Sequence, residues 1–187
     1  MDLPHKLRHA TKSLHAQIES VPLLKKITEN KLTLVHYRMI IERFYGFIAP
    51  CEEVIASLPF QEILINRKKT SLLEQDLLAL GISNNRHAFI PRCNQLPVIS
   101  DREQMLGYLY VIEGSTLGAQ VIIQHLHSQL PTLAGGEQFF RGYGKKTKMM
   151  WDSFCNILTQ ISNVTEQDSI IRSANLTYQL LYQWMLI

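Results

Sequence analysis

The sequence is poor in cysteine and has little excess charge of either sign. Its three cysteines, Cys51, Cys93 and Cys155, form no Cys-x-x-Cys pair, which argues against a disulfide framework and a thiolate zinc site, so we expect a cytoplasmic, reducing compartment. The 19 basic and 16 acidic residues leave a net charge of +3. Because nucleic-acid binding needs a dense basic surface, we expect no nucleic acid among the partners.

Long apolar runs are also missing. The N-terminal stretch MDLPHKLRHATK is charged from its start and lacks the apolar core of a secretory signal. The later segment that most resembles a membrane helix, over 100–130, contains Glu103 and Glu113. We therefore expect no membrane span. The composition, 46% hydrophobic and 19% charged, is that of a folded globular protein, and no repeat or linker divides the 187 residues. We therefore expect one domain over 1–187.

Strand patterns are scarce as well. Alternation of period two never persists, whereas apolar residues recur at helical spacing along most of the chain. The sequence therefore predicts an all-α fold. We expect helices over about 2–20, 33–57, 70–80, 100–130, 145–161 and 165–187, with a short helical turn at 23–27.

Capping residues and prolines place the ends of these helices. Asp2 and Thr165 are expected to cap the first and the last helix, and the patterns 71–74 and 100–103, each Ser-x-x-Glu, to form capping boxes at two others. Pro50 should kink the helix over 33–57, because proline lacks a backbone donor. Between helices we expect a surface loop over 83–97 and a glycine-rich connection over 133–144.

Three glycines lie inside the helix expected over 100–130. Gly107, Gly114 and Gly118 fall within a narrow arc of one face, although each glycine costs a helix about 1 kcal/mol relative to alanine. A face without side chains lets another group come very close to the backbone. Close packing of a second helix would explain the pattern, and so would a flat ligand resting on bare main chain. A transmembrane dimer face fits poorly with the charged and amide residues nearby.

His15 lies on the first helix beside an apolar stripe of Leu7, Leu14 and Ile18. Most histidines in such a setting are ordinary surface or core residues, and the chain has seven histidines in all. A neutral imidazole is a good iron ligand when its second nitrogen is oriented by a partner, and Glu19 lies one turn later.

Two blocks of the sequence resemble the haem (heme) oxygenases, most closely their bacterial branch. LRHATKSLHAQIES resembles the family's N-terminal pattern, in which the iron-binding histidine falls on His15. GYLYVIEGSTLGAQ resembles the family's distal helix, whose glycines fall on Gly114 and Gly118. A weaker third block, FFRGYGKKTKMMWDSF, is similar to the bacterial C-terminal region. The likeness extends over nearly the whole chain in matching order and spacing.

The resemblance implies a helical fold in which haem is held between the first helix and a kinked, glycine-rich distal helix. It also implies oxidative cleavage of haem to biliverdin, carbon monoxide and ferrous iron, with O₂ and with electrons from an external donor protein or reductase. Haem would then be cofactor and substrate at once. The macrocycle would supply the chemistry, and the protein would fix its axial ligand and orientation.

The resemblance also assigns roles to residues. His15 would bind the iron. Bare backbone at Gly114 and Gly118 would leave O₂ room to bend toward a meso carbon, and polar groups and water near Gly114 and Ser115 would donate hydrogen bonds to it. The haem propionates would be held by residues at matching basic and tyrosine positions, namely Arg8, Lys12, Tyr110 and Lys148.

The chain departs from the family pattern at a few positions. Human-type members have an aspartate where this chain has Ser115, and consecutive glycines where it has Gly118 and Ala119. Many members have an arginine at the position of Asp152, so the orientation of haem and the meso carbon attacked stay open. Two other functions also stay open: a non-catalytic haem carrier or sensor on the same fold, and a helical interaction module without haem.

Overall fold

The computed structural model describes residues 2–133 and 135–187, and the surroundings of every side chain among them except residues 119 and 120. That part of the chain has helices and irregular segments but no strand, which confirms the predicted all-α class. Ala134, in the predicted glycine-rich connection, lies outside it. The α-helices are α1 (Leu3–Glu19), α2 (Pro22–Thr28), α3 (Leu34–Ala56), α4 (Thr70–Ala79), α5 (Arg102–Ser115), α6 (Ala119–Gln129), α7 (Gln138–Arg141), α8 (Thr147–Thr159) and α9 (Val164–Leu186). Short 3₁₀ helices are η1 (Gln61–Leu64), η2 (Asn84–Phe89), η3 (Thr116–Gly118) and η4 (Gly144–Lys146).

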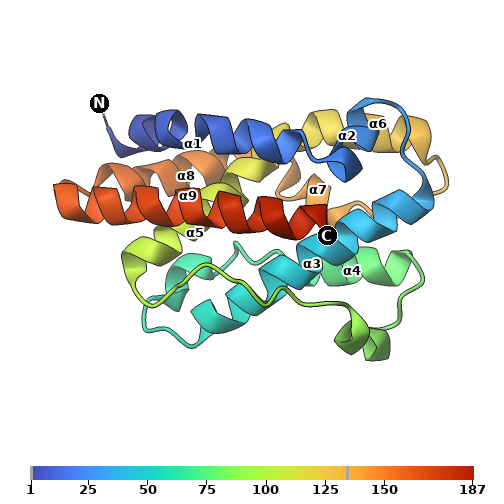
Figure 1. Ribbon diagram of the computed structural model, residues 1–187, viewed down its shortest axis with the longest axis horizontal. Coiled ribbons are helices and arrows are strands. Elements are labelled where there is room, and N and C mark those ends of the chain that lie inside the picture. Colours follow the sequence, from blue (N-terminus) through green and yellow to red (C-terminus); the bar gives the residue numbers. More distant parts are fainter. Residues whose placement is uncertain (1, 134) are drawn as a thin grey trace.

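Four helices, α1, α5, α8 and α9, form one packed group. The helix α1 packs against both α8 and α9, and α5 also packs against both (Figure 1). The helix α3 crosses to the other side of the molecule, where it packs against α4. Buried apolar residues of all these helices join in one hydrophobic cluster. The helices are therefore held mainly by a shared core rather than by their own propensity.

Gly107 explains how α5 and α9 come so close. A β-carbon on Gly107 would lie 2.5 Å from the carbonyl oxygen of Ile170 and 2.5 Å from the Cβ of Ser173. Both of these belong to α9, and no side chain would fit between the two backbones. Of the two readings of the glycine face, close helix packing is therefore the right one at this position.

Three of the four predicted caps need correction, although α4 begins at residue 70, as predicted. The helix α1 does begin after Asp2, whose carboxylate accepts from the backbone N–H of His5 at 3.1 Å. At the other three helices the N-cap position lies one to two residues from the expected one. At each of them the group that accepts from the free N–H donors also differs from the expected one. At α5 the cap is Asp101, one residue later than expected, and at α9 it is Asn163, two residues before Thr165.

The capping box expected at Ser71 is wrong, because the acceptor comes from another helix. The carboxylate of Glu52, on α3, accepts from the backbone N–H of Lys69 at 2.6 Å and from that of Thr70 at 3.2 Å. Those two groups are among the free donors that every helix leaves at its N-terminus. A buried glutamate on a neighbouring helix thus does the work that a local serine was expected to do.

Pro50 leaves a backbone carbonyl of α3 free to bind an irregular segment later in the chain. The helix α3 continues through Pro50, but proline has no N–H to offer the carbonyl of Gly46, four residues earlier. That carbonyl accepts instead from the backbone N–H of Cys93 at 2.9 Å, and a β-carbon on Gly46 would collide with the carbonyl oxygen of Pro91. The segment over 83–97, predicted as a surface loop, is irregular apart from η2, but it buries side chains such as Ile90. Most of its other residues are exposed, as expected for a surface loop.

The helix predicted as one unit over 100–130 is broken. It consists of α5, the short η3 and α6, and the part over 102–118 is bent by 57° from the part over 121–129. This agrees with the kinked distal helix that the family resemblance implies. Within the described residues no single helix is long and apolar enough to cross a membrane. By length and composition alone, the two bent parts over 102–118 and 121–129 would together suffice.

Candidate functional site

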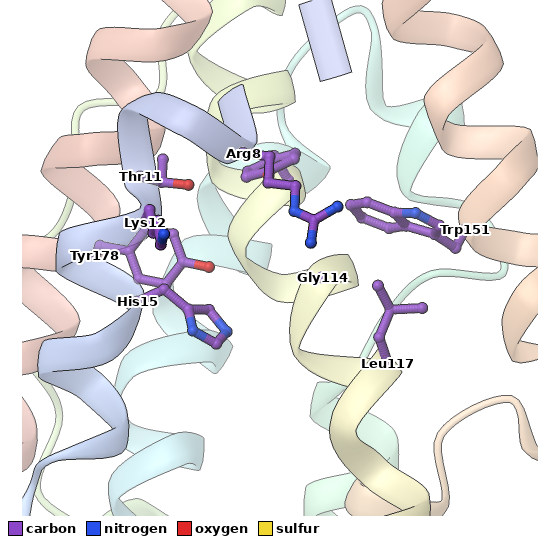
Figure 2. A pocket seen from close by; sticks show the side chains of 9 residues that line it. Arg8, Thr11, Lys12, His15, Gly114, Leu117, Trp151 and Tyr178 are labelled. Atoms are coloured by element: carbon purple, nitrogen blue, oxygen red, sulfur yellow. The ribbon is translucent and has the colours of Figure 1, made fainter. Parts of the chain in front are cut away.

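A cavity lies where α1, α5, α8 and α9 meet η3. Its volume is about 570 Å³, within the range of roughly 300–1,000 Å³ typical of small-molecule and cofactor sites. Figure 2 shows side chains from α1 on one side of the cavity and the backbone of α5 on the other. The lining residues are Arg8, Thr11, Lys12, His15, Tyr110, Gly114, Leu117, Trp151 and Tyr178.

His15 faces the cavity from α1, opposite Gly114 (Figure 2). Its side chain is half exposed, and its Nδ1 lies 3.6 Å from Oε1 of Glu19, one turn later. That distance is too long for a direct hydrogen bond, so Glu19 can orient the ring only through charge or a bridging water. The ring of Tyr178 meets it edge to face, with 5.9 Å between centroids. With Nδ1 on the side of Glu19, Nε2 is the nitrogen available to a ligand.

Gly114 and Gly118 differ from Gly107 in having open space above them. A β-carbon on Gly114 would meet only the Trp151 ring, at 3.8 Å, and for Gly118 no described atom lies within 4 Å of that position. Ordinary helix packing does not account for either glycine. At Gly114, which lines the cavity, the backbone itself forms part of the wall.

Ser115 follows Gly114 but is not among the described residues that line the cavity. Its hydroxyl donates to the carbonyl of Ile112 at 2.7 Å, a bond within the last turn of α5. The proton of this hydroxyl is therefore already committed, and only the lone pairs of the oxygen remain for a further partner.

The predicted cationic residues separate into two groups. Arg8 and Lys12 line the cavity from α1, and both side chains are exposed at its rim. Lys148 lies outside the described lining, and its ammonium pairs with Oδ2 of Asp152 at 2.5 Å on the surface of α8. The structure brings Arg8 and Lys12 to His15, whereas the role of Lys148 stays a prediction.

Aromatic side chains form the remaining walls. Tyr110 was predicted, and it lies next to Trp151 with 5.7 Å between ring centroids. Trp151 and Tyr178 were not singled out from the sequence, because an aromatic residue at helical spacing is more often part of the core. Burial raises the pKa of Tyr110 and that of Tyr178, so both hydroxyls stay protonated at neutral pH and can act as donors.

These residues fit a flat macrocycle with one axial nitrogen ligand. The imidazole of His15 supplies the nitrogen donor, and the wall opposite it has no side chain at Gly114. Aromatic rings flank the space between His15 and Gly114. The cations Arg8 and Lys12 lie at its rim, where they could bind the carboxylates of haem. Cavity shape and donor chemistry therefore agree with haem as the ligand.

Known proteins show the same fold. Heme oxygenase-2 from Synechocystis sp. PCC 6803, solved in complex with heme and NO, matches with a TM-score of 0.84 at 18% identity over 99% of this chain and 84% of its own. The heme oxygenase of Leptospira interrogans matches with a TM-score of 0.81 at 17% identity, over 100% and 99% of the two chains. The NO- and CO-bound heme oxygenase of Neisseria meningitidis gives 0.79 at 16% identity, over 99% and 90%. These identities establish the fold alone.

Sequence comparison identifies the family. A search among curated proteins found no match. The family model described as heme oxygenase, however, matches residues 1–186, which is almost the entire chain. This match covers both the His15 helix and the helix that carries Gly114, so the chain belongs to the heme oxygenase family.

Proposed function

We propose that this protein is an active haem oxygenase, which uses O₂ and electrons from an external donor to open haem to biliverdin, carbon monoxide and ferrous iron. The observation that carries the proposal is the cavity in which the His15 imidazole faces the bare backbone of Gly114. Bound haem supplies the oxygen activation and is itself the molecule that is opened. The protein residues bind it, orient it and shape the space above it.

His15 is the proposed iron ligand. A neutral imidazole donates through Nε2, while Glu19 stands on the Nδ1 side of the ring and favours a proton on that nitrogen. The edge of the Tyr178 ring limits how far the imidazole can turn. The ligand nitrogen is thereby aimed into the cavity before haem arrives.

Gly114 and Gly118 are the proposed distal residues. Because neither carries a side chain, O₂ would find room over the porphyrin plane to lean toward its edge, where the meso carbons lie. Ser115 is proposed to help only as an acceptor that orients water, because its hydroxyl proton is bound to the carbonyl of Ile112. Donors from the backbone and from such water would stabilise developing negative charge.

Arg8, Lys12 and Tyr110 are the proposed anchors of the haem propionates. The two cations are exposed at the cavity rim and attract carboxylates without a large desolvation cost. The hydroxyl of Tyr110 is protonated at neutral pH, since burial raises its pKa above an already high ordinary value, and it can donate to a carboxylate. Lys148, the fourth predicted anchor, would have to leave Asp152 to join them.

The test is a single-turnover experiment on protein loaded with hemin. Under air with ascorbate or a reductase, we expect the Soret band to disappear while a biliverdin band grows, and chromatography to show the isomer formed. A haem carrier or sensor would keep its Soret band under the same conditions. A helical interaction module would show no Soret shift when hemin is added. Either of these two results would contradict the proposed activity.

A further inference from the structure

Glu113, the residue directly before Gly114, carries a carboxylate that is almost fully buried. It is 1% exposed and is not among the described residues that line the cavity. Its Oε2 accepts from Nη1 of Arg67 at 2.6 Å, and its Oε1 accepts from Nζ of Lys69 at 2.8 Å. The hydroxyl of Tyr143 also donates to Oε1, at 2.7 Å. We call Arg67, Lys69, Glu113 and Tyr143 the Glu113 network.

The network joins α5 to segments that are distant in the sequence. Arg67 and Lys69 lie between η1 and α4, and Tyr143 lies between α7 and η4. Lys69 also donates to the Tyr143 hydroxyl at 2.6 Å, with its ammonium 4.0 Å from the centroid of that ring. Burial lowers the pKa of Lys69, while the carboxylate of Glu113 favours its charged form. The last turn of α5 is thus held from two sides.

Arg67 extends the network to α8, next to a wall of the cavity. Its Nη1 donates to the carbonyl of Met150 at 3.1 Å, and its guanidinium lies 5.5 Å from the centroid of the Phe154 ring. Trp151 lies between these two residues in the sequence, and its ring is the described ring nearest to the bare backbone of Gly114. One guanidinium therefore links the residue before Gly114 to the residue before Trp151.

Stability alone is a weak reason for such a cluster. A buried ion pair is often no more stabilising than an apolar cluster of the same volume, because both charges lose their hydration. What it does provide is a fixed geometry, since a carboxylate bonded by three donors from other segments has little freedom to shift. Gly114 has no side chain of its own that could fix its position. Its placement must come from its neighbours.

We propose that Glu113 is a positioning residue, whose buried contacts with Arg67, Lys69 and Tyr143 set the distance between the Gly114 backbone and the Trp151 ring. In the proposed haem oxygenase reaction, on which this part rests, that distance sets how the macrocycle sits in the cavity and hence which meso carbon is opened. Glu113 touches neither the cavity nor its contents and acts only through Gly114 and Trp151.

The first test uses apoprotein and its two tryptophans, Trp151 and Trp184. In a Trp184→Phe background, only Trp151 fluoresces. We expect Glu113→Gln, which keeps the shape of the side chain and removes its charge, to raise acrylamide quenching of Trp151 about twofold. In a Trp151→Phe background, quenching of Trp184, which donates to the carbonyl of Arg43, should not change. Helical circular dichroism should also be unchanged.

Glu53→Gln is the matched control, because Glu53 forms an exposed ion pair with Arg92 elsewhere on the surface. It should leave Trp151 quenching at the parental value. Should Glu113→Gln fail to fold, Tyr143→Phe carries the test. It removes the two hydrogen bonds of the Tyr143 hydroxyl, to Glu113 and from Lys69, but no charge, and it should also raise quenching of Trp151. Parental Trp151 quenching in the folded Glu113→Gln protein, or in Tyr143→Phe if that is the one that folds, would overturn the proposal.

The second test uses the haem-loaded protein and the ratio of biliverdin isomers. We expect Glu113→Gln to change that ratio by about threefold or more relative to the parent, with Glu53→Gln unchanged. An identical ratio in parent and Glu113→Gln would refute the link to haem orientation. If the parent protein forms no biliverdin, the proposed function fails, and the tryptophan measurement still decides whether Glu113 positions this wall.

Discussion

The ring of Trp151 lies 3.8 Å from the point that a β-carbon on Gly114 would occupy, a distance of ordinary van der Waals contact. Alanine should therefore fit at position 114, while leucine should extend into the cavity. We expect Gly114→Leu to weaken hemin binding at least tenfold, as expected for a filled cavity, and Gly114→Ala to change it little. Hemin titration of the two apoproteins, followed by the Soret band, checks this. Equal affinities would mean that the ligand does not rest on Gly114.

Gly107 lies on the same face of α5 as Gly114, but alanine should not be tolerated there. A β-carbon there would sit 2.5 Å from the Ile170 carbonyl, so α5 and α9 would have to move apart. We expect Gly107→Ala to lower the free energy of unfolding by about 1–3 kcal/mol. In contrast, Gly114→Ala should leave it unchanged or raise it by up to about 1 kcal/mol, because alanine favours the helix. Urea unfolding of both variants measures the difference, and similar losses would argue against the assigned close contact.

His15→Ala should remove the axial ligand without disturbing the fold. The side chain is half exposed, so the free energy of unfolding should change by no more than about 0.5 kcal/mol. Hemin affinity should fall by at least about tenfold, and the Soret maximum should move. Added imidazole should restore the parental spectrum. His9→Ala is the control, since His9 is exposed on the same helix and lies outside the cavity lining. Unchanged spectra in the His15 variant would contradict its role.

Much of the fold was readable because helical periodicity persists along the chain, and Asp2 and Thr33 act as local caps. The caps of α4 and α5 were misassigned because the groups that bind their free N–H donors were not the expected serines. The Glu52 carboxylate that caps α4 lies on another helix, and no pattern around Ser71 reveals it.

The site was predictable where a motif carried it. His15 and Gly114 lie in two distinctive blocks, and the structure brings both to one cavity. Tyr178 lies in no such block and is reached only through the packing of α9 on α1. Glu113 and Lys69 were missed because a charged residue in an amphipathic sequence normally faces solvent, and their pairing exists only after folding.

The rim cations should act through the propionates. Arg8→Gln and Lys12→Gln should each weaken hemin binding about twofold to fivefold at low salt, with less effect at high salt, since exposed ion pairs contribute little. Lys148→Gln should have a smaller effect, because Asp152 already holds that ammonium. Hemin dimethyl ester, which lacks the carboxylates, should bind all these proteins alike. A loss of affinity for the ester as large as that for hemin would rule out a propionate contact.

Asp76 should make the stability depend on pH. Its buried carboxylate accepts from the backbone N–H groups of Gln138 and Phe139, and burial raises its pKa to about 6. Between about pH 4 and pH 6 the folded protein keeps a proton that the unfolded chain releases, so this group's contribution to stability falls as pH rises. It is constant above that window.

Asp76→Asn tests this dependence. We expect the difference in unfolding free energy, parent minus variant, to fall by up to about 1.4 kcal/mol per pH unit between pH 4 and pH 6. Urea unfolding at several pH values gives that difference directly. A difference that stays constant or grows across this range would show that Asp76 is not buried in the protonated form.

The proline in α3 has a consequence for how residues can change together. Since Pro50 leaves the Gly46 carbonyl free for Cys93, a residue with a backbone N–H at position 50 would compete for the same acceptor. Any side chain at position 46 would in turn push away the Pro91 main chain. Substitutions at positions 46 and 50 are thus limited by the segment that contains Pro91 and Cys93, far along the chain. Which residues are tolerated on one side depends on the backbone position of the other.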